Sequence, residues 1–504
     1  MQKYLLIFLF TLISCDINTK RNDSSILTSK QLYDQKCSLC HIAPDVDVLP
    51  KNLWIKLLPE LGAKMGILEP GFNPFDGLSI EEIDEIIESN YYTNNILVTD
   101  NQWEELKDYI LKNSPEELFI DKKIKPELKT LKSFNIKRID LDKKPGSFIT
   151  FLSFENNNLF YADFFGGFYK YNFQLNESIE YSKFKDPIVW YQELDNGHKI
   201  FTEIGKLDPT ELKVGKLWSE GVNSEKQLIK DELHRPVHTL TYDFDNNGSY
   251  EHVISEFGHL TGKISILREN GVSEVLWPNP GSILSKAYDI NNDGYMDIIS
   301  LVAQGDEAII SFVQQEDNTF KAEYLMRYPP NYGSSWFEMI DFDNDGDLDL
   351  ITAHGDNADK TYTQKPYHGV RISINDGFGN FKESFFYQLD GATRIVAEDF
   401  DKDNDVDIAV VSTFPDYENY PEMAFLYLNN LGNYNFEENI ISDVDLGRWF
   451  LLDKGDIDND GDIDIFLSSF TYTFSPVPDS FKKKWNDSNV DMIFLENNLK
   501  NSQN

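Results

Sequence analysis

The sequence predicts two unlike parts: a small all-α domain near the N-terminus, followed by an all-β domain built from repeated blades, a β-propeller in which seven blades are expected. Two observations support this division. Residues 28–118 place apolar side chains at helical spacing, whereas an acidic motif recurs five times from Asp243 onward. A chain of 504 residues, of which 41% are hydrophobic, is long enough to form both cores.

The composition excludes several classes of partner. The chain holds 85 Asp and Glu residues against 46 Lys and Arg, a formal net charge of −39. Nucleic acids and anionic membrane surfaces attract net positive faces, so nucleic acid is not an expected partner. With 14% aromatic residues the chain is also too apolar for disorder, and its excess of carboxylates needs another explanation.

The first fifteen residues, MQKYLLIFLFTLISC, have the pattern of an export signal. Lys3 precedes an apolar run that is shorter than the roughly 20 residues a membrane span needs. The ending LISC resembles the lipobox of bacterial lipoproteins, which implies a signal peptide over 1–15, a diacylated Cys15 and a tether over 16–27. An ordinary signal peptide with a chance cysteine is the alternative.

The resemblance to lipoproteins implies a location as well. It predicts a lipid anchor in a membrane of the Gram-negative cell envelope, because Asp16 follows the anchored cysteine. The outer membrane is expected, with the periplasmic and the cell-surface side both open.

The stretch QKCSLCHIAP holds Cys37 and Cys40, spaced Cys-x-x-Cys, with His41 directly after them. A disulfide, a metal clip, a thiol redox switch and a covalent haem all use such a pair. No second cysteine pair is present for zinc, the surrounding pattern is helical instead of βαβ, and a disulfide across two residues would constrain little. In an exported chain, Cys-x-x-Cys-His is the signal for c-type haem attachment.

Residues 28–118 resemble a small class I cytochrome c over their whole length, with the haem motif on the first helix. The resemblance implies a covalent c-type haem, thioethers to Cys37 and Cys40, and His41 as the proximal iron ligand. Met65 is the only methionine in the rest of this region and the candidate sixth ligand, although it follows His41 more closely than is usual in class I cytochromes. A vacant distal site and a core role for Met65 are the alternatives.

Two helix signals support the helical character of this region. Ser79 and Glu82 form a capping box, in which each side chain bonds the backbone of the other residue at the start of a helix. Farther along, Trp103, Leu106 and Ile110 fall on one face of a predicted helix.

The five acidic segments share one pattern, with Asp or Asn at positions 1, 3 and 5, Gly at position 6 in four of them, and an acid at position 9. Ca²⁺ takes six to eight oxygen ligands, which a tight loop can present inward from alternate side chains. Glycine permits the left-handed turn that this wrapping needs, and Asn404 replaces it in the fourth loop. The sequence therefore predicts up to five Ca²⁺ ions, with these candidate ligands: Asp243, Asp245, Asn247, Glu251, Asp289, Asn291, Asp293, Asp297, Asp341, Asp343, Asp345, Asp349, Asp399, Asp401, Asp403, Asp407, Asp456, Asp458, Asp460 and Asp464.

EF-hands begin in the same way, but they require Glu at position 12 and helices on both sides. Position 12 is never Glu here, and β-branched apolar runs follow the loops. A second strand and an Asn-Gly turn come next in the clearest copies, so these segments resemble FG-GAP or VCBS repeats, the calcium-loop blades of integrin-type β-propellers. Solvated acidic turns without metal are the remaining alternative.

The blade count follows from the loops and from what precedes them. Five loops imply five blades, and the strand-rich segments that begin at Ser147 and Pro187 add two more without a loop. The propeller is expected over 141–500, after a linker over 119–140, and a count of six or eight blades is the alternative. The segment VDMIFLENN near the C-terminus is expected to pair with the first blade and close the ring.

The haem is the only redox chemistry that the residues specify, so the expected function is electron transfer without enzymatic activity of its own, and no catalytic residue is predicted. The calcium-stabilised propeller is expected to dock a redox partner protein, or a surface polymer or glycan. In one alternative the propeller is a dehydrogenase-type catalytic domain that passes electrons to the haem. The residues five before each loop would then approach the axis: His238, Leu284, Trp336, Arg394 and Leu451.

A second alternative is an adhesion module that binds glycan or protein. It rests on the polar insertion 353–370, which is expected to be an exposed loop and contains His354 and His368.

Overall fold

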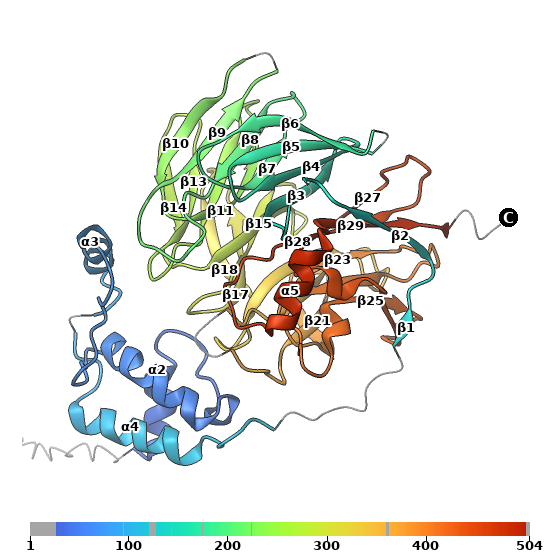
Figure 1. Ribbon diagram of the computed structural model, residues 1–504. Coiled ribbons are helices and arrows are strands. Elements are labelled where there is room, and N and C mark those ends of the chain that lie inside the picture. The colour runs from blue at the N-terminus through green and yellow to red at the C-terminus, as the bar shows by residue number, and fades with distance from the viewer. Residues whose placement is uncertain are drawn as a thin grey trace, which may run out of the picture.

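The computed structural model describes residues 27–93, 95–119, 128–142, 144–173, 175–222, 224–358 and 362–499. A small helical domain lies beside a much larger ring of sheets (Figure 1). The predicted signal peptide, Cys15 and the tether apart from Leu27 lie outside the described residues. Among the helices that are described, none combines the length and the apolar composition of a membrane span.

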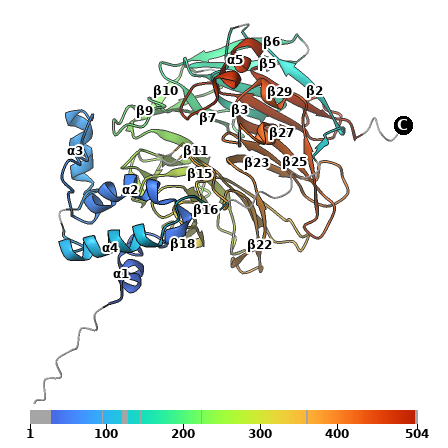
Figure 2. The same cartoon turned by 60° about the horizontal axis from the view of Figure 1, so that its bottom comes forward.

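The helical domain consists of α1 (Ser29–Cys37), the short 3₁₀ helix η1 (Val46–Val48), α2 (Lys51–Lys64), α3 (Ile80–Glu88) and α4 (Asp100–Asn113). Capping boxes begin three of these helices, including the predicted pair Ser79 and Glu82 at α3. Both α1 and α2 pack against α4, whose predicted apolar face of Trp103, Leu106 and Ile110 is buried. Figure 2 shows these three helices together and α3 set apart from them.

Seven antiparallel sheets form the seven-bladed propeller, which confirms the expected blade count. Blades 1 and 2 are the two blades without an acidic loop. They contain β3 (Ile149–Glu155), β4 (Asn158–Asp163), β5 (Gly167–Asn172) and β6 (Glu177–Lys183), then β7 (Ile188–Glu193), β8 (Lys199–Glu203), β9 (Gly215–Glu220) and β10 (Gln227–Leu233).

Each of the next three blades contains one acidic loop between its first two strands. Blade 3 contains β11 (Pro236–Tyr242), β12 (Glu251–Glu256), β13 (Lys263–Leu267) and β14 (Ser273–Trp277). Blade 4 contains β15 (Ser282–Tyr288), β16 (Asp297–Val302), β17 (Ala308–Gln314) and β18 (Phe320–Arg327). Blade 5 contains β19 (Ser334–Ile340), β20 (Asp349–His354), β21 (Gly369–Asn375) and β22 (Phe381–Gln388).

Blades 6 and 7 carry the last two loops, and each recruits a strand from the segment that follows the helical domain. Blade 6 contains β23 (Ala392–Glu398), β24 (Asp407–Ser412), β25 (Phe425–Asn430) and β26 (Phe436–Ile440), with β1 (Lys129–Thr130) parallel to β26. Blade 7 contains β27 (Trp449–Gly455), β28 (Asp464–Ser469), β29 (Met492–Asn497) and β2 (Phe134–Ile139). Helix α5 (Asp479–Ser488) lies between β28 and β29.

Strand β2 closes the ring. It pairs antiparallel with β29, from Phe134 opposite Asn497 to Ile139 opposite Met492. The expected pairing of the C-terminal segment with the first blade is therefore wrong, because β29 lies between β28 and β2. Residues 129–139, which the sequence placed in the linker, belong to the propeller.

The first strand of each blade contacts the first strands of both neighbouring blades, so these seven strands form the inner wall. All seven carry a register shift between their first and third residues. Such a bulge redirects the side chains that follow it. The third residues thus form one layer around the axis: Phe151, Trp190, His238, Leu284, Trp336, Arg394 and Leu451.

Candidate functional sites

The Cys-x-x-Cys-His motif lies at the end of α1. Cys37 is partly buried against the helical core, Cys40 is exposed, and both thiols are free. The ring of His41 is held by a contact of 2.8 Å between its Nδ1 and the carbonyl oxygen of Ile42. A histidine that ligates a metal commonly donates its other ring N–H to a backbone carbonyl in this way. The contact leaves Nε2 of His41 without a hydrogen-bond partner in the described part of the chain.

The protonation of these groups distinguishes between the possible uses of the motif. Burial lowers the pKa of His41, and the nearby ammonium of Lys64 lowers it further, so the imidazole is neutral and able to ligate. Burial raises the pKa of Cys37 to about 12, whereas redox-active thiols have lowered pKa values. Among the described residues, no cluster of three potential metal-ligating side chains includes the motif. These observations disfavour a thiol switch and a zinc site.

Met65 lies at the C-terminal end of α2, where it is partly buried against the same core cluster as Cys37. Its carbonyl oxygen accepts a hydrogen bond of 3.0 Å from the backbone N–H of Leu97. The turn after it is tight: Gly66 has a φ of +84°, and a Cβ there would lie 2.6 Å from the carbonyl oxygen of Asn95. The structure therefore places Met65 in the same part of the helical domain as the motif.

The surface of the helical domain also suits an apolar cofactor. Six large apolar side chains are more than half exposed on it: Leu39, Ile55, Leu68, Ile80, Ile87 and Ile96. Leu39 lies between the two cysteines, and Ile96 lies beside Gly66. Binding sites for organic cofactors are lined mainly by apolar side chains. The free thiols, the free Nε2 and the exposed Leu39 between the two cysteines fit a covalently attached haem.

The five acidic loops, numbered 1 to 5 along the chain, fold alike. The position 1 carboxylate accepts the backbone N–H of position 5 at 3.0–3.1 Å and that of position 6 at 2.8–3.1 Å. Position 6 is left-handed in every loop, including Asn404 with a φ of +74°. Position 4 is left-handed as well, a feature that was not predicted. The expected turn chemistry of the loops is confirmed.

Four loops bring three carboxylates within 4.8 Å of one another, close enough to hold one metal ion. The groups contain positions 1, 3 and 9 in loops 1 and 3, and positions 1, 3 and 5 in loops 4 and 5. Loop 2, with Asn291 at position 3, has no such trio of acids. A fifth group, Asp140, Asp142 and Asp491, lies at the junction of β2 and β29 and was not predicted, since its members come from opposite ends of the propeller.

The acids at position 9 have a structural role of their own. All five are at most 2% exposed. In loop 3, Asp349 accepts the backbone N–H of Phe342 at 2.9 Å and that of Asn375, on the third strand of the blade, at 2.8 Å. The equivalent contact with the third strand recurs in loops 2, 4 and 5 at 2.8 Å. Position 9 therefore clips each of these loops to its blade.

Crowding of carboxylates perturbs the loops. Burial, with a smaller contribution from neighbouring loop carboxylates, raises the pKa of Asp407 and of Asp464 to about 7. Burial likewise raises the pKa of Asp401 to about 6, followed by repulsion from Asp403. A divalent cation would relieve this repulsion, and carboxylate oxygens are the ligands that Ca²⁺ prefers.

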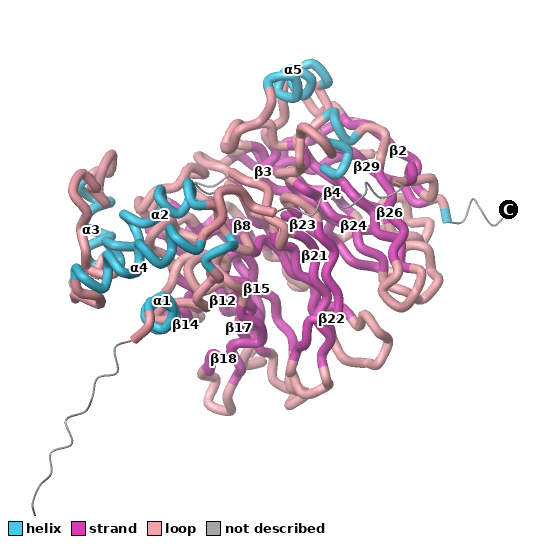
Figure 3. The backbone as a smooth tube through the Cα atoms, turned by 90° about the horizontal axis from the view of Figure 1, so that it is seen from below, coloured by secondary structure: helices cyan, strands magenta, loops and turns pink. Residues whose placement is uncertain are grey.

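The helical domain and the acidic loops occupy opposite faces of the ring. In an antiparallel blade the connection from strand 1 to 2 emerges at one edge of the sheet, and the connection from strand 2 to 3 at the other. The acidic loops are all of the first kind. Connections of the second kind, from strand 2 to strand 3, contact the helical domain. From two of them, Thr210 donates to Glu82 at 2.6 Å and Tyr367 donates to the carbonyl oxygen of Val48 at 3.1 Å. Figure 3 shows the four helices of the helical domain together at one side of the strands.

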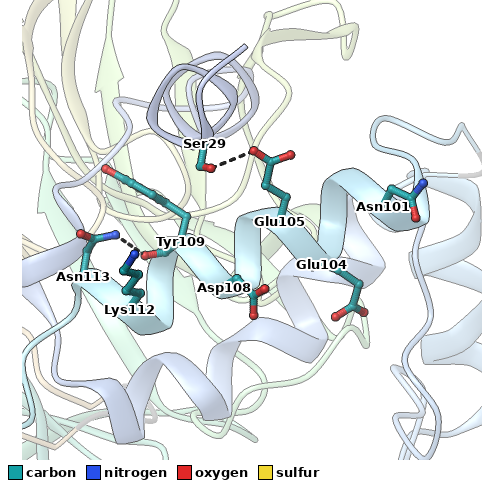
Figure 4. A pocket seen from close by; sticks show the side chains of 8 residues that line it. All are labelled: Ser29, Asn101, Glu104, Glu105, Asp108, Tyr109, Lys112 and Asn113. Atoms are coloured by element: carbon teal, nitrogen blue, oxygen red, sulfur yellow. Dashed lines mark hydrogen bonds between the residues drawn. The ribbon is translucent and has the colours of Figure 1, made fainter. Parts of the chain in front are cut away.

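The Cys-x-x-Cys-His motif is close to the rim of blade 4. Asp306 and Arg327, which pair at 2.6 Å, lie near enough to His41 to affect its pKa. A groove between α1 and α4 is lined by Ser29, Asn101, Glu104, Glu105, Asp108, Tyr109, Lys112 and Asn113 (Figure 4). It contains none of the predicted site residues.

The histidines of the 353–370 insertion are not exposed. His354 is 0% exposed, with Nδ1 3.0 Å from the hydroxyl of Ser334 and Nε2 2.8 Å from that of Thr352. His368 is 1% exposed. The expectation of a solvated loop at these two positions is wrong: His354 is the last residue of β20, and Tyr367, next to His368, stacks on Tyr332 of the segment before blade 5.

Many solved structures match the chain, and three of them illustrate how low the similarity is. The N-terminal domain of Nup159 matches with 10% identity and a TM-score of 0.41, over 73% of this chain and 97% of that one. The computationally designed Ika8 protein matches with 9% identity and a TM-score of 0.39, over 72% and 100%, and luciferin-regenerating enzyme with 10% and 0.37, over 61% and 99%. These likenesses carry no argument about function, and the seven-bladed assignment rests on the strand order.

Comparison with protein families agrees with the repeats in the sequence. No curated protein matches the chain. A family model described as "FG-GAP-like repeat" matches residues 289–352, which span loops 2 and 3. This part of the propeller is similar to FG-GAP-like repeats.

Proposed function

We propose that this chain is an envelope-anchored c-type haem electron-transfer protein whose β-propeller serves as a binding scaffold. The observation that carries the proposal is the setting of His41, whose Nδ1 is held by the Ile42 carbonyl while Nε2 remains free beside two free thiols. Bound haem supplies one-electron chemistry. Cys37 and Cys40 would attach it, and His41 would ligate the iron with Met65 as the candidate sixth ligand.

The protein's own residues have identifiable tasks in this proposal. The Ile42 carbonyl orients the imidazole of His41, and burial keeps it neutral. Glu82 and Val48 hold the helical domain against blades 2 and 5, so that the motif stays near the rim of blade 4. If the helical domain is held rigidly on the propeller, the propeller surface would select the partner while the haem exchanges electrons with it.

The propeller supplies the binding surface in this proposal. A seven-bladed ring with FG-GAP-like repeats suits a binding or scaffold role, and its partner would be a redox protein or a surface polymer or glycan. The net charge of −39 favours partners with positively charged faces, whose association should slow as ionic strength rises. Diacylation of Cys15 would tether the chain to the envelope membrane.

The acidic loops would hold Ca²⁺ and stiffen this scaffold. Support comes from the shared loop geometry and from carboxylate groups within 4.8 Å of one another in four loops. Because the loops lie on the face away from the helical domain, the ions would stabilise the ring without entering the haem site.

The proposal is tested by spectroelectrochemistry of the full chain, produced with c-type maturation machinery. Reversible one-electron reduction with a low-spin spectrum is expected for the wild type. The control His198→Ala alters an exposed loop histidine and should behave identically. The variant His41→Ala should lose the low-spin spectrum, since the proximal ligand is gone. A wild type without haem, or an unchanged spectrum in His41→Ala, would contradict the proposal and leave a surface-binding propeller as the function.

A further inference from the structure

Two basic residues share one layer of the inner wall. Arg394 and His238 are both third residues of first strands, in blades 6 and 3. Each contacts a tryptophan of the preceding blade in the same layer. The guanidinium carbon of Arg394 lies 3.8 Å from the ring centroid of Trp336, and the imidazole centroid of His238 lies 4.0 Å from that of Trp190.

Arg394 has unmet hydrogen-bonding capacity. In the described part of the chain its guanidinium makes no hydrogen bond, and no carboxylate oxygen lies within 4.0 Å of its nitrogens. Other arginines of the interior are anchored: Arg235 donates to the carbonyl oxygens of Gly258 and Leu207, and Arg448 donates to Tyr472 and Ser475. An arginine fork held over an indole without an acceptor is suited to bind a planar anion.

His238 presents a second free donor. It is 3% exposed, and its Nδ1 accepts the backbone N–H of Ser285 at 3.4 Å. A neutral imidazole that accepts at Nδ1 carries its proton on Nε2. That N–H has no partner among the described residues. It is therefore available to donate to a ligand.

The acids of the next layer already have partners. Glu338 accepts from Lys286 at 2.6 Å and from the indole N–H of Trp336 at 2.8 Å, which occupies both of its oxygens. Asp453 accepts the backbone N–H of Phe154 at 2.7 Å. Burial, followed by the charges of Lys286 and Arg394, lowers the pKa of His238.

We propose that the propeller axis binds a small oxyanion, a carboxylate or a phosphate, between the guanidinium of Arg394 and Nε2–H of His238, with Trp336 as the platform. A carboxylate matches the fork of Arg394 with two parallel N–H···O bonds, and Nε2–H adds a third donor. The first strands run from the face that carries the helical domain toward the acidic loops, so the third residues lie nearer the helical domain. The ligand would enter from that face.

The test uses the full chain and three sodium salts, acetate, succinate and phosphate, with glycerol as the uncharged comparison. Because Trp190 and Trp336 line the layer, binding should change tryptophan fluorescence in a saturable way and give a matching calorimetric isotherm. Binding of the carboxylates alone or of phosphate alone supports the site and identifies its anion. Glycerol should give no signal.

Variants locate the site. Arg394→Gln should weaken binding at least tenfold, and Arg394→Lys should weaken it less because it keeps the charge and loses the fork. Arg138→Gln is the matched control, since Arg138 pairs with Asp443 at the outer edge of blade 7 and should bind as the wild type does. The proposal is overturned if no anion gives a saturable signal, or if affinity is unchanged in Arg394→Gln. Should that variant not fold, unchanged affinity in Arg394→Lys overturns it equally.

Discussion

Asp349 and Asp343 belong to the same carboxylate group of loop 3 but should respond differently to removal of charge. Asp349 is 0% exposed and accepts two backbone N–H groups, whereas Asp343 is exposed on the loop. In Asp349→Asn one backbone N–H faces an amide NH₂ in place of an oxygen. A lost bond to a charged acceptor costs about 1.5–3 kcal/mol, and removal of a buried charge returns part of it, so the net loss should be about 2 kcal/mol.

The effect on melting follows from the size of the domain. A propeller of roughly 370 residues has an unfolding entropy near 0.8 kcal/mol per kelvin, so a loss of about 2 kcal/mol should lower Tm by about 2–3 °C. This decrease should appear both in Ca²⁺ and in chelator, because the clip is independent of the ion. Asp343→Asn should leave Tm in chelator within about 1 °C of the wild type, since this carboxylate is exposed and an amide oxygen can still accept a backbone N–H there. The Asp343→Asn variant should lose part of the increase in Tm that Ca²⁺ provides.

Differential scanning calorimetry of both variants, with Ca²⁺ and with chelator, separates the two roles. Equal Tm values for Asp349→Asn and the wild type in chelator would refute the clip. Identical responses of the two variants in every condition would show that position 9 acts only as a ligand.

Three further perturbations test the remaining parts of the account. Chelation should lower the wild-type Tm, since ligand at 100 times its Kd stabilises by about 2.7 kcal/mol per site, and an unchanged melt would exclude calcium loops. Met65→Ala should lower the reduction potential and open the iron to small ligands, whereas an unaltered redox spectrum would remove Met65 from the site. Glu82→Gln should weaken docking of the helical domain by about 1–2 kcal/mol and raise the radius of gyration in X-ray scattering, while the exposed control Glu81→Gln should not. The pKa of Glu82 is lowered to about 2, and the hydrogen bond from Thr210 is the largest cause. The stability that Glu82 contributes is therefore fully present above its unfolded pKa near 4.5 and is lost as the pH falls toward 2.

Local chemistry made much of the fold predictable. The loops could be identified because backbone turns demand particular residues at fixed spacing, and Asn404 was correctly expected in the left-handed turn that Gly adopts elsewhere. The capping box at Ser79 was predictable for the same reason. Repetition then supplied the blade count, since five similar loops and two similar strand clusters imply seven equal units.

Contacts between distant segments were not predictable. Strand β2 is a single short strand in the sequence, and its partner β29 lies at the other end of the chain. The group of Asp140, Asp142 and Asp491 depends on that closure. The burial of His354 and His368 depends on where β20 ends and on contacts with the segment before blade 5, which polar composition alone does not reveal.

The layer of third residues around the axis was predictable in one respect and not in another. The repeat predicted that His238 and Arg394 hold equivalent positions on first strands, and they do. The bulge at every first strand, which sets the layer, has no sequence signal of its own. Leu284 and Leu451, at the same positions, pack into hydrophobic clusters between blades, so equivalence in the repeat does not determine the use of a side chain.

Covalent attachment of haem to the Cys-x-x-Cys-His motif is the central claim, and mass analysis of one peptide tests it most directly. Trypsin should release a peptide that begins at Cys37 and ends at Lys51, well separated from the predicted lipid anchor. The account predicts that this peptide from the mature protein carries one haem and absorbs visible light, and that a Cys37→Ala, Cys40→Ala double variant yields the bare peptide. A wild-type peptide with two free thiols, from cells with active c-type maturation, would contradict it.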